Sequence, residues 1–278
     1  MLPCACFFSH EQHTNKANKI GVKTMNSSAA PIRVGLIVPS SNVTIETELP
    51  ALLTGHESAT FTFHSSRMRM QEVSEEGLQT MNAQRERCVA ELTDASCDSL
   101  VYGCLVAIMA QGPGEHRRVT TAIREQLIGQ ASMLPVVTSA DALIEAIRAL
   151  GAQRVALVTP YLKPLAQKVV DYIEAEDIEV TDWVALEEPD NAAVARIAGE
   201  RILAAAHTLD LTKADALILS ACVQMPSLSL IELAEAEFDM PVLSAATATA
   251  FTLLYRLGLP TVLPGAGHLL QKDRREVE

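Results

Sequence analysis

Three short apolar segments occur twice in this chain, in the same order, and this duplication limits the folds open to it. The pairs are RVGLIVP and RVALVTP (33–39 and 154–160), LVYGC and ILSAC (100–104 and 218–222), and PVVTS and PVLSA (135–139 and 241–245). Each segment is short, rich in β-branched residues and bounded by turn-forming residues, as expected of a buried strand. The chain is therefore predicted to contain two copies of one structural unit.

Segments with helical spacing follow these strands. Residues 40–53, 161–177 and 191–209 each have apolar residues at helical intervals, and the last of these is predicted as one amphipathic helix. Gly151 is a plausible C-cap for the helix that starts near 140. Strands that alternate with helices indicate βαβ units and parallel sheets. We expect an α/β protein with two Rossmann-like lobes, each a small parallel sheet flanked by helices, related by pseudo-two-fold symmetry around a central cleft.

The third repeated pair sets the expected lobe boundaries. The first lobe is predicted to comprise 31–138 plus 246–278, and the second lobe 139–245. Residues 1–30 are polar, show no helical periodicity and have no counterpart in the repeat, so we expect a disordered extension. Met25 could be the natural start of the protein.

The composition and net charge limit the kinds of molecule that this chain is expected to bind. The chain has 278 residues, 49% of them hydrophobic, and a formal net charge of −12. Such a charge argues against nucleic-acid binding, and no apolar run is long enough to span a membrane. The N-terminus lacks the pattern of an export signal, so we expect a cytoplasmic protein whose cysteines are reduced thiols. An anionic small ligand would have to be bound by local donors.

Two of the cysteines end equivalent strands. Cys104 follows LVYG and Cys222 follows ILSA. Ligands of parallel sheets bind beyond the carboxyl ends of the strands, so both thiols should lie at the rim of one cleft. The loops that start at Pro39 and Thr159 should reach the same cleft. Cys88 and Cys97 have no repeated counterpart and are expected to pack in the core.

Paired thiols across a cleft can act as an acid and a base, or as a nucleophile and a proton donor. No histidine or second cysteine lies close enough in sequence to either thiol to suggest zinc, and the spacing is not C-x-x-C. Cys4 and Cys6 could in principle bind a metal, but in a polar tail they are expected to be incidental. We expect no metal and no cofactor.

Four motifs in order resemble the maleate cis–trans isomerase family, within the aspartate/glutamate racemase superfamily. They are VGLIVPSSNVTIETELP (34–50), VYGCLVAIM (101–109), LVTPY (157–161) and SACVQMPSL (220–228). The resemblance implies a cofactor-free, commonly dimeric enzyme that takes a small dicarboxylate as substrate. It also implies participation in nicotinate degradation.

The resemblance also implies site residues. Cys104 would be the nucleophile and Cys222 the second catalytic thiol, a proton donor and acceptor. Substrate contacts would come from the side chains of Asn42, Tyr161 and Asn191 and from the backbone after each cysteine. The backbone positions are Leu105, Val106, Val223 and Gln224.

Each polar candidate also has a structural alternative. Asn42 and Asn191 could simply cap helices, and Tyr161 could be an ordinary half-buried tyrosine. Under the catalytic interpretation, the Cys104 thiolate adds to the double bond of maleate, the resulting single bond rotates, and elimination gives fumarate. Donors and helix N-termini around the cleft are expected to lower the pKa of the thiol.

Other functions use the same architecture. An amino-acid racemase needs the two thiols but also a group that recognises an ammonium, and the loop PSSN (39–42) offers neutral donors instead. A decarboxylase of the superfamily needs only one thiol. A non-catalytic solute-binding protein could use a two-lobed cleft, but it would not need paired thiols and would normally carry an export signal.

Overall fold

The computed structural model describes residues 30–70 and 72–274. In these residues two four-stranded sheets are present, with orders β2-β1-β3-β4 and β6-β5-β7-β8. All of their strand pairs are parallel. The two sheets share one strand order, so the prediction of a duplicated α/β fold with parallel sheets is confirmed.

The strands of the first sheet are β1 (Ile32–Pro39), β2 (Phe61–Met68), β3 (Ser99–Tyr102) and β4 (Val136–Thr138). Those of the second are β5 (Arg154–Thr159), β6 (Glu179–Ala185), β7 (Ala216–Ser220) and β8 (Val242–Ser244). Strands β3, β4, β7 and β8 are buried along their whole length, because helices cover both faces of each sheet. The edge strands β2 and β6 are only partly buried.

The helices of the first half are α1 (Ile45–Thr54), α2 (Glu75–Asn82), α3 (Arg85–Asp94), α4 (Leu105–Met109) and α5 (Glu115–Gly129). The remaining helices are α6 (Ser139–Ala149), α7 (Lys163–Glu174), α8 (Asn191–Val194), α9 (Gly199–Ala206), α10 (Ile231–Phe238) and α11 (Ala245–Arg256). Two 3₁₀ turns, η1 (Leu228–Leu230) and η2 (His268–Leu270), complete the described elements. Gly151 follows α6 with a φ of +73°, as expected at a helix C-terminus.

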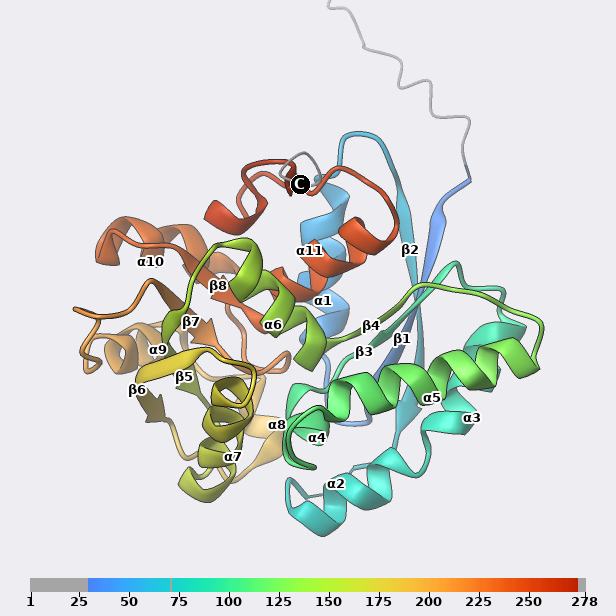
Figure 1. Ribbon diagram of the computed structural model, residues 1–278, viewed down its shortest axis with the longest axis horizontal. Helices are drawn as coiled ribbons and strands as arrows, with labels where there is room; N and C mark the ends of the chain where they lie inside the picture. The colour runs from blue at the N-terminus through green and yellow to red at the C-terminus, as the bar shows by residue number, and fades with distance from the viewer. Residues whose placement is uncertain (1–29, 71, 275–278) are drawn as a thin grey trace, which may run out of the picture.

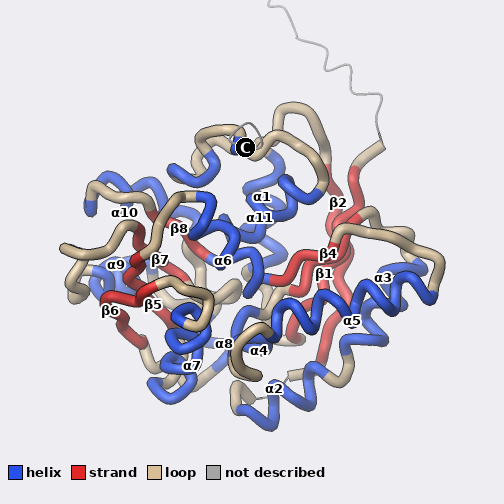
Figure 2. The backbone as a smooth tube through the Cα atoms, viewed as in Figure 1, coloured by secondary structure: helices blue, strands red, loops and turns tan. Residues whose placement is uncertain are grey.

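Helices α6 and α11 join the two halves. Figure 1 shows the two sheets on opposite sides of the molecule with α1, α6 and α11 between them, and Figure 2 shows the same arrangement as helix and strand layers. Helix α6 follows β4 and α11 follows β8, so the two are equivalent, and they pack against each other. Arg256 on α11 pairs with Asp141 and Glu145 on α6. The chain passes from one sheet to the other at α6 and returns at α11. The proposed lobe limits of 31–138 plus 246–278 and 139–245 remain a prediction.

The prediction of a single helix over 191–209 is wrong. Helix α8 ends at Val194 and α9 begins at Gly199. A Cβ at Gly199 would lie 2.8 Å from Leu230 Cδ2, so the chain approaches η1 closely at this point. This tertiary contact interrupts a pattern that is helical in sequence.

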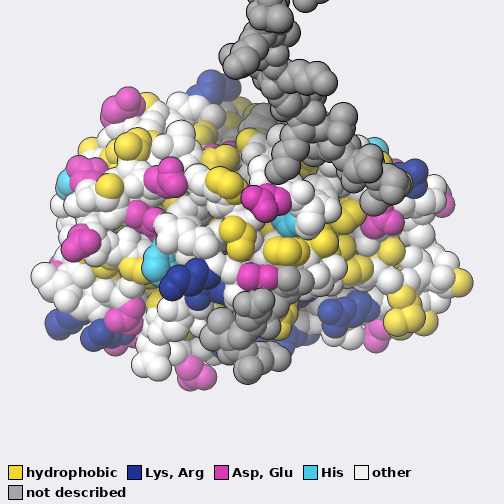
Figure 3. All heavy atoms as spheres, turned by 90° about the horizontal axis from the view of Figure 1, so that it is seen from above, with side chains coloured by type: hydrophobic (Ala, Val, Ile, Leu, Met, Phe, Trp, Pro, Cys, Tyr) yellow, Lys and Arg dark blue, Asp and Glu magenta, His cyan; other side chains and the backbone are white. Residues whose placement is uncertain are grey.

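The predicted extension, residues 1–30, with Cys4, Cys6 and Met25, lies outside the described residues except for Ala30. Across 30–70 and 72–274, no helix combines the length and apolar character needed to cross a bilayer. Figure 3 shows one face of the molecule, where basic side chains lie at separate places and acidic side chains are scattered among them.

Candidate active site

A small cavity of about 20 Å³ lies at the carboxyl ends of both sheets. It is lined by Pro39, Asn42, Met70, Val73, Cys104, Leu105, Val106, Tyr161, Asn191, Cys222, Val223 and Gln224. The end of β1 and the loops after β3, β5 and β7 all reach it, which is where ligands of parallel sheets bind. Every site residue predicted from the sequence lies on this one cavity.

Cys104 is placed by a close approach between β3 and α1. The Gly103 N–H donates to Ile37 O at 2.8 Å, which extends the pairing of β3 with β1 by one residue. A Cβ at Gly103 would lie 2.6 Å from Ile45 Cδ1, so only glycine fits here without a shift. Cys104 then turns the chain into α4, and the Ala107 N–H in the first turn of that helix lowers the pKa of the thiol.

Cys222 occupies the equivalent place after β7. The Ser220 hydroxyl donates to Cys222 O at 2.9 Å and to Met225 O at 3.1 Å, which fixes the turn. The thiol receives the N–H of Gln224 at 3.4 Å. Tyr161 is buried, at 7% exposure, and its hydroxyl donates to Ala221 O at 3.4 Å; a hydrogen bond from the same hydroxyl lowers the pKa of Cys222.

Both thiols are more deeply buried than the sequence predicts. Cys104 is 5% exposed and Cys222 is 7% exposed, so neither lies at an open rim. Met70 and Val73, from the segment between β2 and α2, also line the cavity.

This burial changes the acid–base properties of the thiols. Desolvation raises the pKa of Cys104 to about 12 and outweighs the hydrogen bond from Ala107. Desolvation also raises the pKa of Cys222, against the opposing hydrogen bonds from Tyr161, Gln224 and Met225. The Ala107 N–H lowers the pKa of the Cys104 thiol, as expected of a local donor, but burial raises it more, so the predicted net lowering is wrong. The physical reason is that burial in the protein disfavours the charged thiolate.

Asn42 combines a structural contact with a place on the cavity. Its Oδ1 accepts the N–H of Ile45 at 3.2 Å, which caps the start of α1, and the residue is 1% exposed. Its loop is held by Arg67, which sequence reasoning missed. Arg67 Nη1 donates to Ser40 O and to Asn42 O, each at 3.0 Å. No local sequence pattern identifies Arg67, because it lies in β2 and its partners lie in the loop that follows β1.

Asn191 connects the two halves across the cavity. The helix cap at this position is Asp190, whose Oδ1 accepts the N–H of Ala192 at 2.9 Å, so the capping alternative for Asn191 is excluded. The Asn191 amide donates to the Ser41 hydroxyl, and its backbone carbonyl accepts from the Gln224 side chain.

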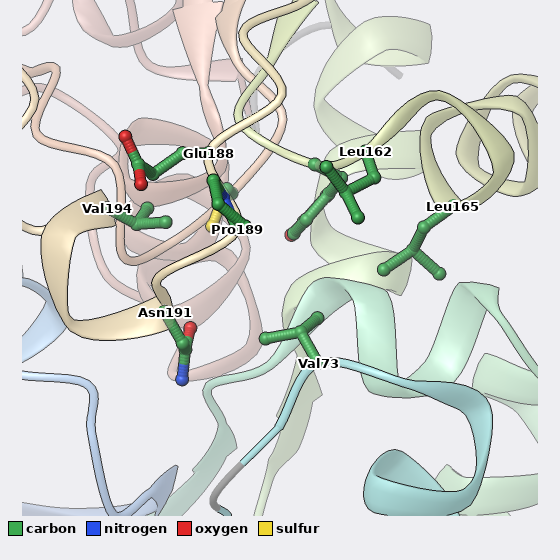
Figure 4. Close-up of a pocket in the computed structure, with 9 residues that line it drawn as sticks. Val73, Leu162, Leu165, Glu188, Pro189, Asn191 and Val194 are labelled. Atoms are coloured by element: carbon green, nitrogen blue, oxygen red, sulfur yellow. The ribbon is translucent and has the colours of Figure 1, made fainter.

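A second pocket of about 40 Å³ shares Val73, Tyr161, Asn191 and Cys222 with the cavity. Figure 4 shows Val73 across from Leu162, with Asn191 on one side and Leu165 on the other. Val73, Leu162 and Leu165 thus form an apolar border beside the thiols.

The cavity offers neutral donors. Among the described residues that line it, none is Lys, Arg, His, Asp or Glu. A bound carboxylate would therefore be held by amides, by the Tyr161 hydroxyl and by backbone N–H groups. Within the described part of the chain, no group of three or more His, Cys, Asp or Glu side chains could hold a metal ion.

The comparison with protein families gives a match over nearly all the described chain. The sequence model of the arylmalonate decarboxylase family matches residues 34–270. Among curated proteins, the maleate isomerase of Nocardia farcinica (strain IFM 10152) is 60% identical over 241 residues, which cover 87% of this chain and 96% of the relative.

Solved structures agree with this match. The Nocardia farcinica maleate cis–trans isomerase, as a cysteine-to-serine mutant with a covalently bound succinylcysteine intermediate, has a TM-score of 0.86 and 59% identity. The alignment covers 87% of this chain and 99% of that one. A cysteine-to-alanine variant of the maleate isomerase of Pseudomonas putida S16, solved with maleate, has a TM-score of 0.86 and 49% identity, with coverage of 87% and 98%.

Proposed function

This chain belongs to the maleate isomerase family, and we propose that its buried cavity converts maleate to fumarate through the thiols of Cys104 and Cys222. The observation that carries this proposal is the cavity itself. Two thiols from equivalent strand ends line one buried cavity whose described lining residues offer neutral donors and no charged side chain. This suits a small diacid with a reactive double bond.

The first role is substrate binding. We propose that Asn42, Asn191 and Tyr161 contact the carboxylates, together with the backbone of Leu105 and Val106. Val223 and Gln224 play the equivalent part after Cys222. These groups are fixed by the hydrogen bonds and packing of the cavity, so they would need little reorganisation when charge moves onto a carboxylate.

The second role is covalent catalysis. Cys104 reacts as a thiolate, with its proton released to solvent, and its sulfur forms a bond to one alkene carbon, while the π electrons move to the other carbon and into its carboxylate. Cys222 gives a proton to that carbon, which leaves a succinyl thioether with a freely rotating carbon–carbon bond and Cys222 as a thiolate. After rotation, the Cys222 thiolate takes a proton back from the same carbon, the carbon–sulfur bond breaks and its electron pair returns to the sulfur of Cys104. The product is fumarate, Cys222 is again a thiol and Cys104 is again the thiolate that starts the next turnover.

The rival reactions fit the cavity less well. A racemase must recognise an ammonium group, and no carboxylate is present among the described residues that line the cavity. The arylmalonate decarboxylase family model matches the fold, but a decarboxylase of this superfamily needs only one of the two thiols.

The proposed setting of the enzyme rests on the family resemblance. We propose a cytoplasmic homodimer with no cofactor, acting in nicotinate degradation. Light scattering on the purified chain would give its mass, and a monomer at all concentrations would exclude the dimer.

The test of the activity uses purified protein, maleate and proton NMR, in the presence of a chelator and without added nucleotide. We expect the maleate signal to be replaced by fumarate. Unchanged maleate, together with racemised aspartate or glutamate, would support the racemase instead.

The roles of the thiols are tested by intact-protein mass spectrometry. Cys222→Ser should lose most turnover and accumulate an adduct of one diacid on Cys104, because addition occurs but proton removal fails. Cys104→Ser should show no adduct and no turnover. An adduct on Cys222 in an active Cys104→Ser protein would reverse the roles.

A further inference from the structure

Glu48 is a buried carboxylate outside the cavity that the mechanism above does not use. It lies on α1 and is 9% exposed. Its Oε1 accepts the backbone N–H of Ser227 at 2.6 Å and of Leu228 at 2.8 Å. Its Oε2 accepts the Ser227 hydroxyl at 3.3 Å. A side chain of the first half thus binds a loop of the second half, the loop that begins at Cys222.

A second contact from α1 holds the same loop. The hydroxyl of Thr44, one helical turn before Glu48, donates to Gln224 O at 2.7 Å. Thr44 and Glu48 therefore fix the loop at residue 224 and at residues 227 and 228. Only the short segment that carries Cys222 lies between these anchors and β7.

Helix α1 also connects with the opposite side of the cavity. Its start is capped by Asn42, and Ile45 packs directly against Gly103, the residue before Cys104. The position of Cys222 relative to Cys104 and Asn42 consequently depends on how the loop 222–228 is attached to α1.

The contact favours an ionised carboxylate. Both backbone N–H groups donate to Oε1 and the Ser227 hydroxyl donates to Oε2, and a carboxylate accepts at both oxygens. A glutamine could keep its oxygen on the two N–H groups and turn its NH₂ group to the Ser227 hydroxyl, which can accept, whereas a leucine would remove all three bonds. None of the ion pairs among the described residues involves Glu48. The buried carboxylate is therefore stabilised by the neutral donors of Ser227 and Leu228. Burial raises the pKa of Glu48, and the hydrogen bonds from Leu228 and Ser227 oppose the rise.

We propose that Glu48 is a positioning residue for the isomerase: it holds the 222–228 loop on α1 so that the Cys222 thiol faces the carbon that it protonates. This inference rests on the proposed function. Glu48 touches no substrate in this account and acts through the loop alone.

The test compares Glu48→Leu, which removes all three hydrogen bonds, with wild type and with a matched control in the full chain. We expect kcat to fall at least 100-fold with KM changed less than threefold, and the one-diacid adduct on Cys104 to accumulate, as in Cys222→Ser. The control is Glu176→Leu, which removes another buried carboxylate, 5% exposed and paired with Arg117 and Arg148, away from the cavity. This control should lower the melting temperature without adduct accumulation or a change in kcat beyond twofold.

A second readout does not depend on turnover. Alkylation by iodoacetamide, mapped by peptide mass spectrometry without substrate, should be at least tenfold faster at Cys222 in Glu48→Leu, while Cys104 keeps its rate. Glu48→Gln, whose oxygen can still accept both backbone N–H groups, should regain part of the kcat; it also serves if the leucine variant fails to fold.

The outcomes separate the two proposals. Wild type that leaves maleate unchanged refutes the proposed function, while the alkylation rates still decide whether Glu48 holds the loop. Active wild type, with Glu48→Leu retaining kcat within twofold and an unchanged Cys222 alkylation rate, overturns the positioning role.

Discussion

A methyl group added at Gly103 tests whether the contact between α1 and β3 sets the position of Cys104. In Gly103→Ala the new Cβ would lie 2.6 Å from Ile45 Cδ1, 3.3 Å from Val38 Cγ1 and 3.6 Å from Ile37 O. The first distance is far below van der Waals contact, and both side chains are fully buried. Gly103 is not among the described glycines with positive φ, so the strain of the substitution is steric and not conformational.

The size of the effect follows from overpacking. An extra methyl in a close-packed core costs about 1–3 kcal/mol, offset by roughly 0.4–1 kcal/mol from the lower entropy of the unfolded chain. We expect a net loss of about 1–2 kcal/mol. In a chain of this size that corresponds to a fall of roughly 2–8 °C in melting temperature. A shift of about 1 Å in the next residue, Cys104, can cost on the order of 100-fold in kcat.

The assay pairs this variant with Ile45→Val, which deletes the Cδ1 atom that the new methyl would meet. Alone, Ile45→Val should cost about 0.5–1.5 kcal/mol as a small cavity. In the double variant the clash is gone, so stability and kcat should both exceed those of Gly103→Ala. Thermal unfolding measures the first quantity and NMR of maleate the second. Strictly additive stability losses, with no recovery of kcat, would refute the argument that this contact positions Cys104.

The remaining predictions concern the pKa of Cys104, the hydroxyl of Tyr161, the side chain of Arg67 and the N-terminal residues. Because burial raises the pKa of Cys104 to about 12, its alkylation rate without substrate should rise about tenfold per pH unit between pH 7 and 10; a plateau near pH 8 would contradict this. Tyr161→Phe removes a hydroxyl that lowers the pKa of Cys222, so we expect kcat to fall about 10- to 100-fold with the stability nearly unchanged. Arg67→Met should weaken maleate binding by loosening the loop of Asn42, measured as a raised KM. A chain that starts at Met25 should keep its melting temperature and activity, and loss of either would show that the deleted residues contribute to the core.

Strands β1, β3, β4, β5, β7 and β8 could be predicted from the sequence because most of their residues are buried. Such strands appear in the sequence as short β-branched runs, and their duplication identified each pair independently. Strands β2 and β6, which each lie at one edge of a sheet, were not predicted. Phe61–Met68 has only two buried residues, Ser66 and Met68, and Glu179–Ala185 has none, so neither gives a continuous apolar signal.

The site was predictable to the extent that it lies at strand ends. Cys104, Tyr161 and Cys222 follow repeated segments, so the topology of a parallel sheet brings them together. Glu48 and Arg67 act through backbone groups that are distant in sequence, and no local motif marks them. The error in the predicted pKa of Cys104 has a similar origin. A sequence motif shows which donors lie near a thiol but does not show how deeply the thiol is buried.

Duplication explains why there are two thiols, and their unequal surroundings support giving them different roles. Three donors oppose the rise in the pKa of Cys222: the Tyr161 hydroxyl and the backbone of Gln224 and Met225. Cys104 receives one such bond, from Ala107, and the neighbouring Cys222 makes its ionisation harder. More hydrogen bonds stabilise a thiolate after it gives up its proton, which suits the proton transfer proposed for Cys222. A thiolate with fewer such bonds is more reactive toward an electrophilic carbon, which suits the bond formation proposed for Cys104. The same strand end, repeated in a different neighbourhood, therefore supports the two different roles proposed for Cys104 and Cys222.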